Sequence, residues 1–94
     1  MYKSANLATT ENLEFEPRGD DAVLGLSRYS VAVAVINGHT ITIERYSPAA
    51  EAWHSTGDTA ITTVCEYIGQ CAAGTKYRIV CTGGTGAATV EVSS

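Results

Sequence analysis

The chain has 94 residues, with ten acidic side chains against six basic ones and a formal net charge of −4 at pH 7. This length allows one small domain and excludes multidomain enzymes, nucleotide-binding α/β folds and (β/α)8 barrels. The acidic balance leaves no basic stripe for a phosphate backbone, so we expect no nucleic-acid partner.

The residue types favour strands over helices. Val, Ile and Thr together number 26, whereas Leu, Met, Lys and Gln together number 8. Residues of the first group suit a pleated, half-buried sheet, and those of the second suit helices. With nine Gly available for turns, the composition predicts an all-β protein.

The front of the chain is expected to be an arm. Residues 1–12 show no clear hydrophobic period, so they are interpreted as an N-terminal arm, and residues 13–94 as a single β-sandwich domain. Residues 13–16 alternate apolar and acidic side chains, which predicts a short strand. A turn at 17–21 and a second short strand at 22–26 are expected to follow.

The clearest local signal is the pair Asn37-Gly38, which separates two strand patterns at 30–36 and 39–46. Asn-Gly supplies the two positive-φ residues of a type I′ turn, so the segment predicts a β-hairpin. Both faces of the first strand are apolar, which predicts a central position in its sheet. In the second strand the isoleucines are expected to face the core.

The rest of the chain also consists of short strand patterns separated by turns and loops. Further strands are expected at 51–54, 61–67, 76–82 and 88–92, with a loop at 69–74 and a glycine-rich turn at 82–86. This gives seven to eight short strands about ten residues apart, with no helical period. Such regular short strands predict an antiparallel β-sandwich, with a small barrel as the alternative.

The residues offer no catalytic or metal-binding set. His39 and His54 are expected at exposed or rim positions, and neither is paired with a nucleophile signature. The cysteines, Cys65, Cys71 and Cys81, lack the close pairs of a zinc site. We therefore expect no enzyme, no cofactor and no metal. A disulfide between Cys65 and Cys71 is left open.

The N-terminus and the length of the apolar stretches suggest a protein that folds in a cytoplasm. The N-terminus lacks the apolar region of a signal peptide, and no stretch approaches the roughly 18 apolar residues of a membrane span. We therefore expect no membrane partner.

Aromatic and large apolar side chains provide the candidates for a contact surface. The interface candidates are Tyr2, Leu7, Tyr29, Tyr46 and Trp53. Trp53 is open to two interpretations, the central core residue of a small sandwich or part of a contact surface.

The segment from Gly74 to Cys81 resembles the strand that carries the tyrosine corner in immunoglobulin-like and fibronectin-like domains. The resemblance implies an immunoglobulin-like sandwich. It also implies that the hydroxyl of Tyr77 bonds back to the upstream backbone and fixes a connection between the sheets.

A wider resemblance covers residues 30–94. It includes the strand at 40–47, Trp53, the Gly-x-x-Tyr-Arg pattern that ends at Arg78, a glycine-rich turn and a last strand at 88–93. These features are similar to the small β-sandwich accessory proteins of tailed-bacteriophage virions, of the head decoration or cement type.

That resemblance implies a non-enzymatic structural protein of the virion, made in the host cytoplasm. It would bind the outer capsid surface and stabilise the capsid, with the arm, Tyr46 and Trp53 as contacts. Its partner would be the major capsid protein or another virion protein, and capsid symmetry favours a small homo-oligomer such as a trimer. The alternative is a carbohydrate-binding or adhesion module of a phage tail or head fibre, with Trp53 and a Tyr as the platform for a glycan. Head and tail positions both stay open.

Overall fold

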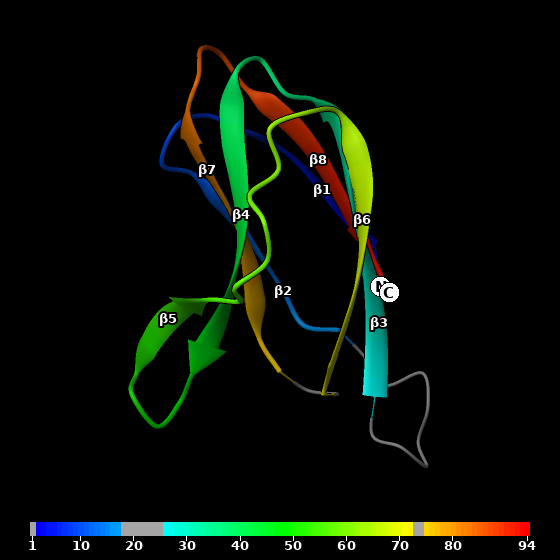
Figure 1. Cartoon of the computed structure of the whole chain (residues 1–94), viewed down its shortest axis with the longest axis vertical. Helices are drawn as coiled ribbons and strands as arrows, with labels where there is room; N and C mark the ends of the chain where they lie inside the picture. Colours follow the sequence, from blue (N-terminus) through cyan, green and yellow to red (C-terminus); the bar gives the residue numbers. More distant parts are fainter. Residues whose placement is uncertain (1, 18–25, 73–74) are drawn as a thin grey trace.

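The computed structural model describes residues 2–17, 26–72 and 75–94. Eight antiparallel strands form two four-stranded sheets that pack as a sandwich (Figure 1). The strands are β1 (Tyr2–Leu7), β2 (Asn12–Phe15), β3 (Leu26–Val35), β4 (His39–Ser47), β5 (Ala52–Ser55), β6 (Cys65–Ala72), β7 (Tyr77–Gly83) and β8 (Ala88–Ser93). The expected all-β sandwich is therefore confirmed. The strand expected at 22–26 falls almost wholly outside the described residues.

The strands pair in a nested order. β1 pairs with β8, β2 with β7, β3 with β6 and β4 with β5, as in one long hairpin rolled onto itself. The pairs β3–β8 and β4–β7 complete two sheets of order β1-β8-β3-β6 and β2-β7-β4-β5. This is the arrangement of a jelly roll. In an immunoglobulin domain the last strand pairs with the strand before it, whereas here β7 and β8 lie in different sheets. The connectivity therefore differs from the immunoglobulin order.

The Asn37-Gly38 turn forms, but it does not make a hairpin. The φ angles are 48° at Asn37 and 74° at Gly38, and the His39 amide donates to the Ile36 carbonyl at 2.9 Å. The strands on either side nevertheless enter opposite sheets. The turn residues determine the local reversal of the chain. They do not determine the neighbours of β3, which are β6 and β8 rather than β4.

The expected N-terminal arm is an edge strand. β1 pairs residue by residue with β8, from Tyr2 opposite Ser93 to Leu7 opposite Ala88. Leu7 is only 4% exposed because it faces the core. Long-range pairing with β8 within the same chain, rather than a local hydrophobic period, orders this segment. Deleting residues 1–12 would therefore remove one of the two strands that pair with β8 rather than a free arm.

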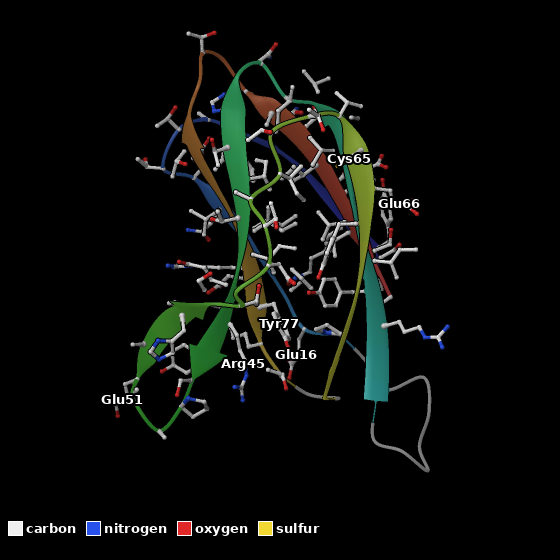
Figure 2. All side chains as sticks on the ribbon, viewed as in Figure 1. Glu16, Arg45, Glu51, Cys65, Glu66 and Tyr77 are labelled. Atoms are coloured by element: carbon white, nitrogen blue, oxygen red, sulfur yellow. The ribbon has the colours of Figure 1, made fainter. Side chains whose placement is uncertain are left out.

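The strand expected at 61–67 is displaced. Ile61 forms an isolated bridge with Ile41, with two backbone hydrogen bonds of 2.8 Å, and β6 begins only at Cys65 (Figure 2). The strand then runs through the segment expected to be a loop. Cys65 and Cys71 are consequently about 20 Å apart along one extended strand. A disulfide needs Cα atoms within about 7 Å, so the two residues cannot pair within the chain, and Cys65 is free.

Alternating side chains from both sheets fill the core. Each inner strand contributes fully buried residues, among them Val31, Ile41, Ile79, Cys81 and Val90. The inward positions expected for Ile41, Ile79 and Cys81 are confirmed. β3 occupies a central place in its sheet, as its two apolar faces predicted.

His39 is a buried residue rather than an exposed one. It starts β4 on the inward face and is 1% exposed, with Nε2 3.0 Å from the Gly86 carbonyl oxygen. In the neighbouring turn, Nδ2 of the Asn37 side chain donates to the Ala87 carbonyl at 2.8 Å, and the Thr85 backbone amide donates to the Asn37 carbonyl at 3.2 Å. The β3–β4 and β7–β8 connections thus interlock over His39.

Candidate binding surface

Two aromatic side chains meet on the outer face of the sheet that contains β4 and β5. Tyr46 and Trp53 lie directly opposite each other on these paired strands. Their ring centroids are 5.3 Å apart, and the rings meet edge to face at 64°. Both side chains are half-buried.

The outward direction of this pair follows from strand alternation. Ile41 and Ile43 are buried on the inner face of β4, so Tyr46 points to the outer face. Trp53 takes the same face because it is the cross-strand partner of Tyr46. The interpretation of Trp53 as the central core residue is therefore wrong, and it belongs to a surface.

Charged side chains hold the aromatic pair in place. The Arg78 guanidinium lies 4.5 Å from the centroid of the Trp53 ring, a cation–π distance. Glu44 Oε1 accepts from Arg78 Nε and Nη2 at 2.7 Å each. Lys76 Nζ lies 6.0 Å from both ring centroids. We call these five residues, Glu44, Tyr46, Trp53, Lys76 and Arg78, the aromatic patch.

A shallow groove of about 190 Å³ borders the aromatic patch, between the β4–β5 turn and the start of β7. Tyr46, Pro48, Thr75 and Lys76 line it. The Tyr46 amide donates to the Lys76 carbonyl at 2.9 Å, which fixes one side of the groove to the other. The patch therefore combines a partly exposed aromatic pair with an adjacent hollow.

The other interface candidates do not join this patch. Tyr2 is 63% exposed on the outer face of the opposite sheet, where its hydroxyl donates to Glu91 at 2.9 Å. That hydrogen bond is the main cause that raises the pKa of Tyr2. Leu7 and Tyr29 are 4% and 3% exposed. Both face the core between the sheets, so neither side chain lies on an exposed surface.

Tyr77 begins β7 and is buried. Its ring packs 5.8 Å from Phe15 and 5.5 Å from Tyr29, centroid to centroid. It therefore helps to join the two sheets through ring contacts. Its role as a tyrosine corner stays a prediction.

Sequence reasoning missed the charged members of the patch. Arg78 follows an inward-facing Tyr77, so alternation alone could have placed it on the outer face. Its pairing with Glu44 depends on the register of β4 against β7, 34 residues away along the chain. No local pattern encodes that register.

Residues 2–17, 26–72 and 75–94 provide neither a metal-ligand cluster nor a membrane-spanning helix. In that part of the chain no group of three or more His, Cys, Asp or Glu side chains is placed to hold a metal ion. Over the same residues, no helix is long and apolar enough to cross a membrane. Comparison with known proteins adds no relative, since no family model, curated protein or solved structure matches the chain.

Proposed function

We propose that the protein is a structural component of a tailed-bacteriophage virion, a decoration protein that binds the outer capsid surface and stabilises the capsid. The aromatic patch is its docking anchor. Its partner is the major capsid protein or another virion protein. A small homo-oligomer such as a trimer suits the closed symmetry of a capsid, and the protein reaches the virion after synthesis in the host cytoplasm.

The composition and rigidity of the aromatic patch carry this proposal. Trp, Tyr and Arg are the residue types that dominate binding energy at protein interfaces, and Trp53, Tyr46 and Arg78 lie together here. The salt bridge to Glu44 orders Arg78 before any partner arrives. Less conformational entropy is then lost on binding, which favours affinity.

Two weaker observations agree with this function. The resemblance of residues 30–94 to phage accessory proteins suggests the virion. Jelly rolls occur in viral capsid domains and in lectins, but a fold by analogy does not settle a function. The aromatic patch therefore remains the main support.

The alternative, a glycan platform made by Trp53 and Tyr46, fits the same patch less well. The two rings meet at 64°, so they present no common flat surface for stacking on a sugar. Arg78 also covers one face of Trp53. This geometry suits insertion into a protein pocket better than an adhesion module.

Cosedimentation with capsids that lack the protein tests the proposal. We expect saturable binding of the wild type, and a loss of at least about 30-fold in affinity for Trp53→Ala, as for an interface hot spot. Tyr2→Ala is the matched control, because it removes an exposed aromatic side chain from the opposite sheet. That variant should bind within about threefold of the wild type.

Equal binding of Trp53→Ala and wild type would refute the patch as the anchor, provided that circular dichroism shows both proteins folded. Purified bacterial surface glycans serve as the parallel bait. Retention on glycans that is lost in Trp53→Ala, without capsid binding, would replace the decoration function with the adhesion alternative.

A further inference from the structure

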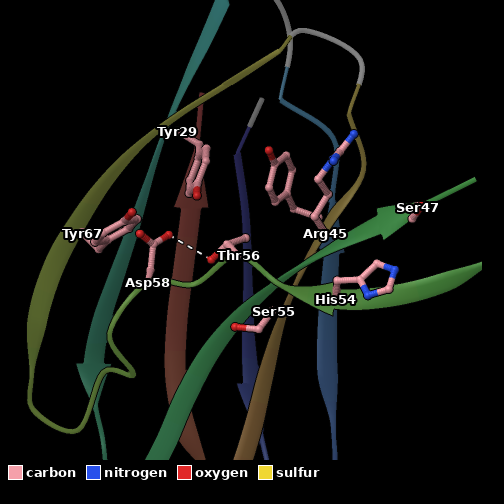
Figure 3. Close-up of a pocket in the computed structure, with 9 residues that line it drawn as sticks. Tyr29, Arg45, Ser47, His54, Ser55, Thr56, Asp58 and Tyr67 are labelled. Carbon is pink, nitrogen blue, oxygen red and sulfur yellow. Dashed lines mark hydrogen bonds between the residues drawn. The ribbon is translucent and has the colours of Figure 1, made fainter. Parts of the chain in front are cut away.

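A second site lies on the other side of β4, between the two sheets. A cleft of about 380 Å³ opens at the end of the sandwich from which the β4–β5 hairpin projects (Figure 3). Tyr29 and Tyr67 line it from one sheet, and Arg45 and Tyr77 from the other. Neither Tyr46 nor Trp53 lines this cleft, and the exposed Arg45 lies between it and the shallow groove beside the aromatic patch.

The inward positions of β4 explain why a cleft exists here. The residues at these positions are Ile41 and Ile43, which are buried in the core, followed by Arg45 and Ser47, which line the cleft. Polar side chains at inward positions are costly unless they contact water or a polar ligand. The core therefore ends at Ile43, and the sheets enclose a polar space beyond it.

The floor of the cleft is aromatic and rigid. Tyr29 and Tyr77 are buried, with ring centroids 5.5 Å apart. Gly69 makes room for the Tyr29 ring, since a Cβ at that position would lie 2.4 Å from its Cζ atom. These rings give the site a fixed shape.

One wall of the cleft carries an oriented carboxylate. Thr56 Oγ1 donates to Asp58 Oδ2 at 2.9 Å (Figure 3). Tyr67 lies beside Asp58 in the cleft (Figure 3), and burial, then the hydrogen bond and charge of Asp58, raise the pKa of Tyr67. The loop after β5 and strand β6 thus hold Asp58 from two directions.

The opposite wall carries a hydrogen-bond donor, the guanidinium of Arg45. Arg45 and His54 are cross-strand partners on β4 and β5, and both line the cleft. The guanidinium only donates, whereas the carboxylate of Asp58 only accepts. A ligand that fits must therefore present acceptors on one side and donors on the other.

We propose that the cleft binds a neutral sugar residue. Its hydroxyl groups both donate and accept, so they satisfy Asp58 on one wall and Arg45 on the other. The charges of Asp58 and Arg45 offset each other, so the cleft favours a neutral ligand over an anion such as phosphate, and its polar walls disfavour apolar ligands. The volume is at the small end of ligand sites, which suits one or two sugar rings. This inference does not depend on capsid docking by the aromatic patch.

The test is an NMR titration of the ¹⁵N-labelled full chain with methyl glycosides of glucose, galactose, mannose and N-acetylglucosamine. Glucuronate and inorganic phosphate serve as anionic probes. We expect saturable shifts of the amides of Thr56, Asp58 and Tyr67 with at least one neutral glycoside, at a Kd of about 1 mM. Asp58→Asn should weaken this binding at least about tenfold, as expected for loss of a charged acceptor. Glu51→Gln, at the exposed tip of the hairpin (Figure 2), removes the same charge outside the cleft and should leave Kd unchanged.

Three results would overturn the proposal: no saturable response to any of the four neutral glycosides, equal binding by Asp58→Asn and wild type, or tighter binding of phosphate than of every glycoside. The spectrum of each variant reports its folding directly. Trp53→Ala should keep glycoside binding, so failure of this site and failure of the capsid anchor are distinguishable.

Discussion

Gly83 and Gly84 are adjacent and share a left-handed backbone, with φ angles of 66° and 69°, but their surroundings differ. A Cβ on Gly84 would lie 2.6 Å from His39 Cγ, 2.7 Å from the His39 backbone nitrogen and 2.8 Å from the Asn37 carbonyl oxygen. A Cβ on Gly83 would meet nothing within 4 Å. Alanine at each position therefore separates the backbone cost from the steric cost.

The expected losses of stability follow from these contacts. Gly83→Ala should lower the free energy of unfolding by about 1 kcal/mol, because alanine must adopt the left-handed conformation there without a steric clash. Gly84→Ala adds overpacking of about 1–3 kcal/mol, because two of the three nearest atoms are backbone and cannot rotate away. The total for Gly84→Ala is then about 2–4 kcal/mol. For a chain of this length, Tm should fall by about 5 °C for Gly83→Ala and by about 10–20 °C for Gly84→Ala.

Urea unfolding followed by tryptophan fluorescence, with thermal melts in parallel, measures both variants against the wild type. The difference between the two alanines is the informative quantity. If Gly83→Ala and Gly84→Ala lose the same stability within about 0.5 kcal/mol, the close packing of Gly84 on His39 is refuted, and with it the interlock of the two turns.

Further predictions concern the core and the cysteines. Ile79→Ala should cost about 2–5 kcal/mol in urea unfolding because Ile79 is fully buried, whereas Ile68→Ala should stay within about 0.5 kcal/mol because that side chain is 65% exposed. Iodoacetamide should modify Cys65 in the native protein and Cys81 only after unfolding, as mapped by peptide mass spectrometry, and equal rates would contradict the burial of Cys81. Burial and then the charge of Glu11 raise the pKa of Cys81, so the native state holds that proton more tightly. Its contribution to stability is complete below the unfolded thiol pKa of about 8.5 and is lost as pH rises through the folded pKa. Wild-type stability should therefore fall more steeply than that of Cys81→Ala between about pH 8 and pH 10, and equal slopes would show that the thiol does not contribute.

Local patterns predicted the elements but not their partners. Alternation placed Ile41 and Ile79 on inner faces, and turn chemistry placed positive φ angles at Asn37 and Gly38. The prediction of a hairpin at residues 30–46 was wrong because a tight turn reverses the chain equally well within one sheet or between two sheets. Strand partners depend on packing along whole strands, which no short window contains.

The N-terminal strand shows the same limit. Tyr2–Leu7 has no alternation that marks it as a strand, and it is ordered by pairing with β8 at the far end of the chain. The aromatic patch could be predicted in part, since Tyr46 and Trp53 stood out as residue types. The cleft could not, because its residues come from separate segments that only the rolled topology brings together.

The nested pairing has a consequence for how the chain folds. Among the strand pairs of the described residues, only β4 and β5 pair by a local reversal, and each outer pair joins segments further apart, up to Tyr2 and Ser93. Such high contact order slows folding to milliseconds or longer. During synthesis β1 and one edge of β3 have no partner until β8 leaves the ribosome, because β8 lies between them. The nascent chain therefore exposes strand edges for most of its synthesis, and closure of the sandwich is a late step.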